Sequence, residues 1–305
     1  MSNDKTCKLC CGHGRLRQSH ITPKFVFDWQ KESSGTGFLR SSETPNRRAQ
    51  DGEKEQMLCG DCEALFNRWE TPFATKIFHP LNRGESIQFR YESWLLKFAV
   101  SVSWRVLTWY RPDDLPEISE HGRLLIAEAL QTWKEFLLDQ RAHPGSFEQH
   151  LILTDVIESI ENIDSLPPNW NRFMTRGCHI NMAHFKGHPL YVYAKMGRVT
   201  LLGFIGIEYP QHWVGTKIHV GEGVIGGSIK VPIQFLDYMK ERAITESCLQ
   251  QKFSSKQVEV IDKTYRKDPD RAVISETFRA LDEDVRMFGT DAVFGRKNLP
   301  GKDTN

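Results

Sequence analysis

The stretches Cys7-Lys8-Leu9-Cys10 and Cys59-Gly60-Asp61-Cys62 decide how the N-terminal part of this 305-residue chain folds. Each Cys-x-x-Cys places two thiolates on one tight turn, so that both can reach the same metal ion. Two such pairs complete a tetrahedral shell with metal–sulfur distances of ~2.3 Å. A redox Cys-x-x-Cys needs only one pair beside a βαβ pattern, which is missing here, and nothing in the chain indicates the oxidising compartment that disulfides require. We therefore expect Cys7, Cys10, Cys59 and Cys62 to hold one structural Zn²⁺.

Cys11 adjoins the first pair and allows a second register, in which Cys7 and Cys11 are the ligands. That register breaks the symmetry of the two turns, so we predict Cys10 as the ligand. Cys11, Cys178 and Cys248 then remain as free thiols, which fits a reducing cytosol. The first residues carry no apolar segment of the kind found in signal peptides. We therefore expect a cytoplasmic protein.

Composition limits the classes of partner. The formal net charge is +1, which argues against a chain wholly dedicated to nucleic acid but leaves room for a local basic face. The most hydrophobic segment, residues 94–110, is interrupted by Lys97 and Arg105 and is shorter than the ~20 apolar residues of a membrane span. We predict a buried helix there and no membrane partner.

Periodicity divides the rest of the chain. Apolar residues recur at three- and four-residue spacings in residues 94–110 and 118–141, as buried helix faces require. Short apolar runs separated by turn residues predict strands at 151–156, 173–182, 190–195 and 199–208. Helices are expected at 233–242, at 254–265 behind a Ser-x-x-Gln capping box, and at 270–287. The polar run 41–55 has no period and is expected to be a loop.

These patterns predict an α+β protein. Residues 1–80 would form a treble-clef zinc module, because turn, excursion, turn and helix follow one another in the order typical of that fold. Residues 81–145 would be a helical connector, residues 146–295 a domain of mixed β-sheet and helix, and residues 296–305 a disordered tail. The mixed domain is expected to supply target selection, regulation or oligomerisation, through a second copy or a protein partner.

Cys7-x2-Cys10, Ser19-His20-Ile21-Thr22-Pro23 and Leu58-Cys59-x2-Cys62-Glu63 together resemble the zinc-containing branch of the HNH endonucleases. The resemblance covers residues 7–75. It implies a nuclease that hydrolyses nucleic acid, DNA more than RNA. The N-terminal module, joined to an unfamiliar domain, also resembles bacterial nucleases of defence and mobile-element systems. The basic residues Arg15, Arg17 and Lys24 would then contact phosphates.

The resemblance also implies roles for two residues. His20 would be the general base that activates water, since an imidazole can take up a proton near physiological pH. Glu63 would stand beside a catalytic Mg²⁺ or Mn²⁺, for which a carboxylate oxygen is a suitable ligand. Glu70 lies two helical turns further, ~10 Å along the axis, which is too far to share one ion directly.

The sequence departs from the family pattern at two positions. Ser19 stands where the family has Asp or His, and Lys54-Glu55-Gln56 stands where an Asn orients the base, leaving Gln50 or Gln56 as a substitute. A second interpretation therefore stays open. In it, the chain is a non-catalytic scaffold that binds nucleic acid or protein, and zinc only stabilises its N-terminal module.

Overall fold

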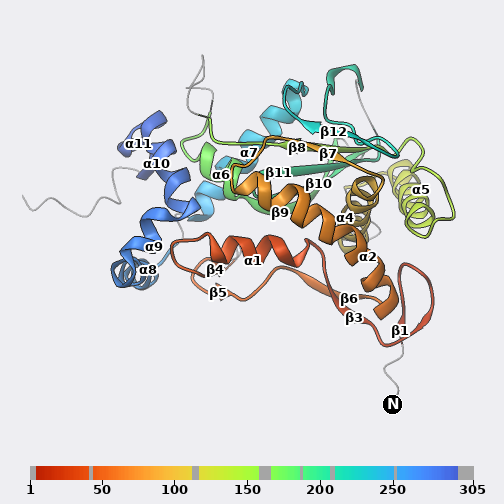
Figure 1. Cartoon of the computed structure of the whole chain (residues 1–305), viewed down its shortest axis with the longest axis horizontal. Coiled ribbons are helices and arrows are strands. Elements are labelled where there is room, and N and C mark those ends of the chain that lie inside the picture. The colour runs from red at the N-terminus through yellow and green to blue at the C-terminus, as the bar shows by residue number, and fades with distance from the viewer. Residues whose placement is uncertain are drawn as a thin grey trace, which may run out of the picture. The chain divides into compact units, whose positions relative to one another are not determined.

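The computed structural model describes residues 5–40, 44–111, 117–157, 166–185, 188–206, 210–250 and 253–294. The chain is a mixed α and β protein (Figure 1). It divides into two compact units. Unit 1 comprises Met1–Val26, Gly52–Thr154 and Cys178–Pro232, and unit 2 comprises Phe27–Asp51, Asp155–Gly177 and Ile233–Asn305. The units therefore interleave along the sequence. The expected disordered tail, residues 296–305, lies outside the described residues.

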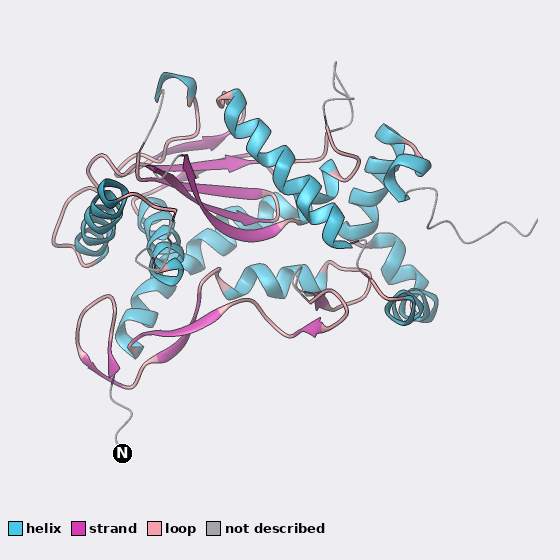
Figure 2. Ribbon diagram, turned by 180° about the vertical axis from the view of Figure 1, so that it is seen from behind, coloured by secondary structure: helices cyan, strands magenta, loops and turns pink. Residues whose placement is uncertain are grey.

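Unit 1 is built on a four-stranded antiparallel sheet (Figure 2). Its order is β8 (Gln149–Leu153), β11 (Val199–Phe204), β10 (His188–Met196) and β9 (Cys178–Phe185). Helix α4 (Trp94–Tyr110) packs on all four strands, and α5 (Glu120–Leu137) packs on α4 and β10. The close approach of α4 requires Gly203, because a Cβ there would lie 2.4 Å from Ser103 Oγ.

The N-terminal part of unit 1 contains a small hairpin, an antiparallel pair of strands that are distant in sequence, and a helix. Strands β1 (Lys5–Thr6) and β2 (His13–Gly14) flank the first cysteine turn. Strand β3 (Arg17–His20) pairs antiparallel with β6 (Lys54–Leu58), and the second cysteine turn then opens α2 (Gly60–Phe73). A π-helical turn at Ala74–Phe78 and helix α3 (His79–Asn82) continue α2. Strand β7 (Gln88–Tyr91) pairs antiparallel with β12 (Gly223–Gly226). A 3-10 turn at Pro210–His212 precedes β12 in the chain.

Unit 2 is mainly helical. Helix α1 (Lys24–Glu32) starts in unit 1 and ends in unit 2, where strands β4 (Leu39–Arg40) and β5 (Arg48–Ala49) follow it. The other helices are α6 (Trp170–Arg176), α7 (Ile233–Gln250), α8 (Ser255–Lys267), α9 (Pro269–Ile274), α10 (Glu276–Phe288) and α11 (Thr290–Phe294).

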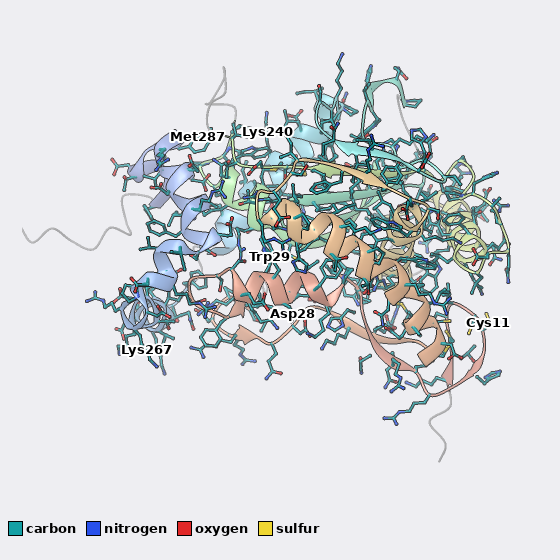
Figure 3. All side chains as sticks on the ribbon, viewed as in Figure 1. Cys11, Asp28, Trp29, Lys240, Lys267 and Met287 are labelled. Atoms are coloured by element: carbon teal, nitrogen blue, oxygen red, sulfur yellow. The ribbon has the colours of Figure 1, made fainter. Side chains whose placement is uncertain are left out.

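Two arginines fasten the end of α1 inside unit 2. The Arg176 guanidinium lies 4.5 Å from the ring centre of Trp29, which Figure 3 labels on α1. It also donates to the Gln30 carbonyl at 3.0 Å. Arg271 donates to the carbonyls of Lys31 and Ser34, both at 3.1 Å. The bonds to Gln30 and Lys31 satisfy carbonyls in the last turn of α1, and the bond to Ser34 fixes the chain just after the helix.

The expected helix at residues 94–110 is confirmed with the same bounds, and the Ser254 hydroxyl accepts the Gln257 N–H at the start of α8 as a capping residue should. The expected strand at 173–182 is wrong in its first half, where α6 runs to Arg176. Asp284, on α10, accepts the backbone N–H groups of Asn171 at 2.7 Å and Arg172 at 3.3 Å. Local sequence patterns cannot predict a helix cap that is supplied by a residue more than a hundred positions away.

The expected last helix is interrupted. Ser275 adopts an extended backbone between α9 and α10, and its hydroxyl accepts the Phe278 N–H as the cap of α10. Within the described residues, no helix has the length and apolar character that crossing a membrane requires.

Buried His150 makes the stability of unit 1 depend on pH. The side chain is 2 % exposed, its Nδ1 lies 2.8 Å from Thr216 Oγ1, and its ring packs against Phe204 and Trp213. Burial lowers its pKa to about 4, although Glu148 acts in the opposite direction. An unfolded chain takes up this proton near pH 6.5. The unfolded state therefore binds more protons between about pH 6.5 and 4, and acid favours it.

We predict that the neutral His150 contributes up to about 3 kcal/mol above pH 6.5, all of it lost on acidification to about pH 4. Urea denaturation of the wild type and of His150→Gln across this range measures it. The difference in unfolding free energy between the two proteins should shrink as the pH falls. A difference that stays constant with pH would contradict the prediction.

Candidate metal centre

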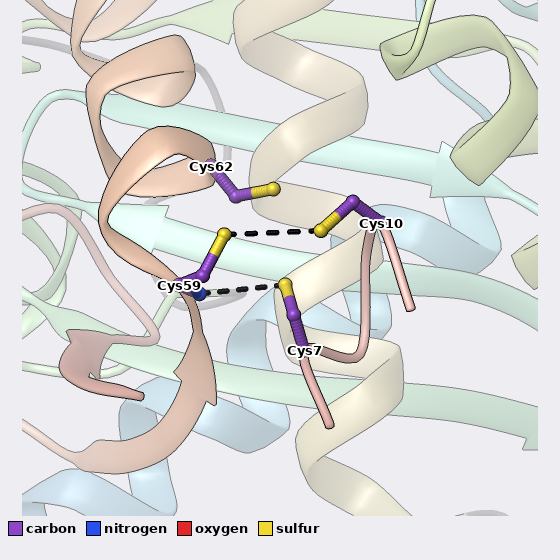
Figure 4. Close-up of side chains that lie close together, drawn as sticks. All are labelled: Cys7, Cys10, Cys59 and Cys62. Carbon is purple, nitrogen blue, oxygen red and sulfur yellow. Dashed lines mark hydrogen bonds between the residues drawn. The ribbon is translucent and has the colours of Figure 1, made fainter. Parts of the chain in front are cut away.

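Four cysteine sulfurs meet at the start of α2 (Figure 4). The Sγ atoms of Cys7, Cys10, Cys59 and Cys62 all lie within 4.8 Å of one another, and those of Cys10 and Cys59 are 3.8 Å apart. Ligands ~2.3 Å from a tetrahedral zinc are about 3.8 Å from each other. In the described part of the chain, no other group of His, Cys, Asp and Glu side chains converges in this way. The four side chains are therefore consistent with a zinc site.

The first turn is shaped by its backbone. The Cys7 N–H donates to the Gly12 carbonyl at 2.9 Å, and the Cys11 N–H donates to the Cys7 carbonyl at 2.9 Å. Cys11 adopts the left-handed conformation, with φ 59°, which closes the turn. The second turn uses the helix start, because Cys59 is the N-cap of α2 and Cys62 lies in its first turn. The Cys59 N–H donates to Cys7 Sγ at 3.4 Å and joins the two turns.

The thiols of this cluster do not share one ionisation state. Burial alone would raise the pKa of Cys7, but the backbone N–H groups of Cys10, Cys59 and Leu9 hold it at about 7. Burial, followed by the neighbouring cysteines, raises the pKa of Cys62. A divalent cation removes this conflict, because a coordinating thiol loses its proton outright. With all four sulfurs bound the shell is closed, which is the arrangement of structural zinc.

Cys11 stays outside the cluster. Its side chain is exposed, and Lys134 on α5 donates to its sulfur at 2.9 Å. The sequence allowed either Cys10 or Cys11 to be the second cysteine of the first turn in the cluster. In the structure the sulfur of Cys10 lies with those of Cys7, Cys59 and Cys62.

Beside the cysteines, β3 and α2 are joined by polar side chains. The Ser19 hydroxyl, 1 % exposed, donates to Glu63 Oε1. Cys62 and Glu63 are neighbours on α2, and successive residues of a helix point about 100° apart. One helical turn therefore presents sulfur to the cysteine cluster and oxygen to β3.

His20 follows Ser19 at the end of β3, and its side chain is half-buried. Its carbonyl accepts a hydrogen bond from Arg105 Nη1 at 3.0 Å. Arg105 lies on α4, is 3 % exposed, and also contacts Glu70 Oε1 through Nη2 at 2.7 Å. One buried guanidinium thus ties the end of β3 to α2 and α4, and it occupies the carboxylate of Glu70.

Glu55 and Gln56 stand where the HNH resemblance expects an Asn that orients the base, and both side chains contact basic residues. Glu55 lies opposite Ser19 in the β3–β6 ladder and contacts Lys8 at 2.9 Å and Arg111 at 3.0 Å. Gln56 accepts a hydrogen bond from Lys5 at 2.8 Å. Both side chains are thus engaged with groups other than His20. The predicted phosphate contacts Arg15, Arg17 and Lys24 are all exposed.

Sequence reasoning missed Arg105. It was counted only as an interruption of an apolar segment, although a charge inside a buried helix face indicates a buried partner. Comparison with known proteins adds no identification, because no family model, no curated protein and no solved structure matches the chain.

We predict one tightly bound zinc per chain. Cys59→Ser should release it and cost several kcal/mol in stability, because the free energy of structural metal binding is free energy of folding. Cys11→Ser is the matched control and should keep the zinc, since its sulfur lies outside the cluster. Elemental analysis and thermal melts measure both. Wild-type protein that is purified without chelator and contains no zinc would contradict the assignment.

We also predict that Arg105→Ala destabilises the protein by about 3–5 kcal/mol, because it leaves Glu70 and the His20 carbonyl without their buried partner. Arg83→Ala is the control, since Arg83 and its partner Glu85 are both more than half exposed. Its melting temperature should stay close to that of the wild type. Equal losses of stability in the two variants would show that the buried contacts of Arg105 stabilise the protein no more than an exposed ion pair does.

Proposed function

We propose that the chain is a metal-dependent endonuclease that hydrolyses phosphodiester bonds of nucleic acid, DNA more than RNA. The observation that carries the proposal is the hydrogen bond between Ser19 and Glu63. It joins the strand that ends in His20 to the first turn of α2. The proposed base and the two proposed oxygen donors would thus come from β3 and α2, which this hydrogen bond joins.

The order of elements supports the same proposal. The first cysteine turn is followed by β2, β3, α1, β4, β5 and β6, and the second cysteine turn then opens α2, which ends at Phe73. The antiparallel pair β3–β6 and the helix after the second turn are the elements on which the resemblance to the HNH type would put the base and the metal-proximal residue. The sequence motif and the arrangement of the elements therefore favour one function.

The zinc centre is not part of the proposed chemistry. Four thiolates leave zinc no open position, so it cannot activate water. Its role is to hold the first cysteine turn against the start of α2 and so to fix the direction in which Glu63 points.

In the proposed reaction His20 accepts the proton of the attacking water. The Ser19 hydroxyl and the Glu63 carboxylate are hard oxygen donors of the kind that Mg²⁺ and Mn²⁺ prefer. Such an ion, when bound, would stabilise negative charge on the scissile phosphate. Mg²⁺ often binds through one or two protein oxygens with water and phosphate in its other positions, so the small donor set is adequate. The exposed cations Arg15, Arg17 and Lys24 would hold the flanking phosphates.

The test is cleavage of plasmid and single-stranded substrates with Mg²⁺ or Mn²⁺. His20→Ala should reduce the rate by ~10²–10⁴-fold, as expected for loss of a general base, and should keep its zinc. Glu63→Gln should raise the concentration of Mg²⁺ or Mn²⁺ needed for activity and leave the zinc content unchanged. His13→Ala is the matched control, because this exposed histidine lies in the first hairpin and outside the proposed site.

Equal cleavage by the wild type and His20→Ala would place the activity elsewhere or in a contaminant. No cleavage by the wild type on any substrate would favour the scaffold interpretation, in which the Ser19–Glu63 bond only fastens β3 to α2.

A further inference from the structure

Strands β4 and β5 place two positive charges directly opposite each other. Arg40 pairs with Arg48 in this antiparallel ladder, inside unit 2. Directly opposed residues have Cβ atoms about 4.5–5.5 Å apart, and like charges at that spacing destabilise the pair. The strands are only two residues long, so few other contacts offset the repulsion.

Neither guanidinium is neutralised within the described residues, where no ion pair joins Arg40 or Arg48 to a carboxylate. Burial lowers the pKa of Arg40, and the charge of Arg48 lowers it further. The two side chains therefore retain an excess of positive charge.

Both arginines are also held in place. The Arg48 guanidinium lies 3.6 Å from the ring centre of Phe38, whose side chain is 39 % exposed. The Gln257 side-chain oxygen, in the amide orientation that satisfies both groups, accepts from Arg40 Nε at 3.3 Å and Nη2 at 2.8 Å. These contacts oppose the outward swing that would otherwise relieve the repulsion.

We propose that Arg40 and Arg48 form a clamp for a phosphate of a nucleic-acid backbone. One phosphodiester between them turns the repulsion into two charge-assisted contacts, and a rigid guanidinium fork suits phosphate oxygens. The exposed Phe38 edge provides an apolar surface for an adjacent base, since aromatic and arginine side chains together favour single strands. The ligand class rests on the proposed function, whereas the anion site rests on unit 2 alone.

Binding is measured by fluorescence anisotropy of a short labelled single-stranded oligonucleotide, without added Mg²⁺ or Mn²⁺ so that the strand stays intact. The variant Arg40→Gln/Arg48→Gln should bind about tenfold more weakly or worse, as for loss of charged hydrogen bonds. Loss of one phosphate contact should reduce the slope of log affinity against log salt by about 0.7. Unchanged affinity and slope would overturn the proposal.

The matched control is Arg279→Gln/Arg286→Gln, which removes the same charge from unit 2. Both control arginines already pair with acids on α10, so their loss should change affinity less than about twofold. Equal weakening by the two double variants would show a general charge effect and would overturn the clamp.

Melting temperatures separate binding from folding. Without ligand, the Arg40→Gln/Arg48→Gln protein should melt close to the wild type, because loss of the repulsion offsets loss of the Gln257 and Phe38 contacts. The oligonucleotide should raise the melting temperature of the wild type but not of the variant. Should the double variant unfold, Arg48→Gln alone changes an exposed side chain and serves the same test. Preferential binding of wild type to phosphatidylserine vesicles would overturn the choice of nucleic acid.

The same proteins distinguish the two proposals. His20→Ala should bind the oligonucleotide like the wild type and fail to cleave it. Clamp-dependent binding without cleavage by the wild type would refute the nuclease and keep the clamp. If cleavage depends on His20 but oligonucleotide binding does not depend on Arg40 and Arg48, the clamp is refuted and the nuclease is kept.

Discussion

The mutual approach of four cysteine sulfurs is the constraint on which the N-terminal part of unit 1 depends. Sulfurs within 4.8 Å of one another cannot all be thiolates unless a cation offsets their charge. A bound zinc would therefore connect Cys7 to Cys62 across more than fifty residues of chain. Closing so long a loop costs configurational entropy that the short strands β1 to β6 could not offset alone. The position of β3 against α2 follows from this connection.

Arg105 supplies a second connection from the opposite side. The zinc ligands fix the start of α2, whereas the Arg105 guanidinium fixes Glu70 near its end and the His20 carbonyl at the end of β3. Helix α4, which carries Arg105, also packs on the four-stranded sheet. The proposed catalytic elements are thus anchored to the core of unit 1. Helix α4, which lies in the segment expected to be a helical connector, therefore joins β3 and α2 to the sheet.

The sequence could predict the features that depend on local chemistry. The cysteine spacing identified the four side chains whose sulfurs converge, apolar periodicity located α4, and Ser254 located the start of α8. Features set by distant partners were missed. The start of α6 is capped by Asp284 from α10, and the charged residue in the middle of α4 has its partners on β3 and α2. Interleaving of the two units has the same origin, because it depends on which distant segments pack together.

The order Cys62-Glu63 shows how a structural metal can determine the geometry of a separate oxygen site. Adjacent residues in a helix cannot face the same way, so a sulfur fixed on the zinc side turns the next carboxylate toward β3. There it meets Ser19, the residue before His20. Soft sulfur donors and hard oxygen donors select different metals. In the proposed function, one helical turn would therefore bind zinc through Cys62 and offer the Glu63 carboxylate to Mg²⁺ or Mn²⁺, and the two ions would not compete for ligands.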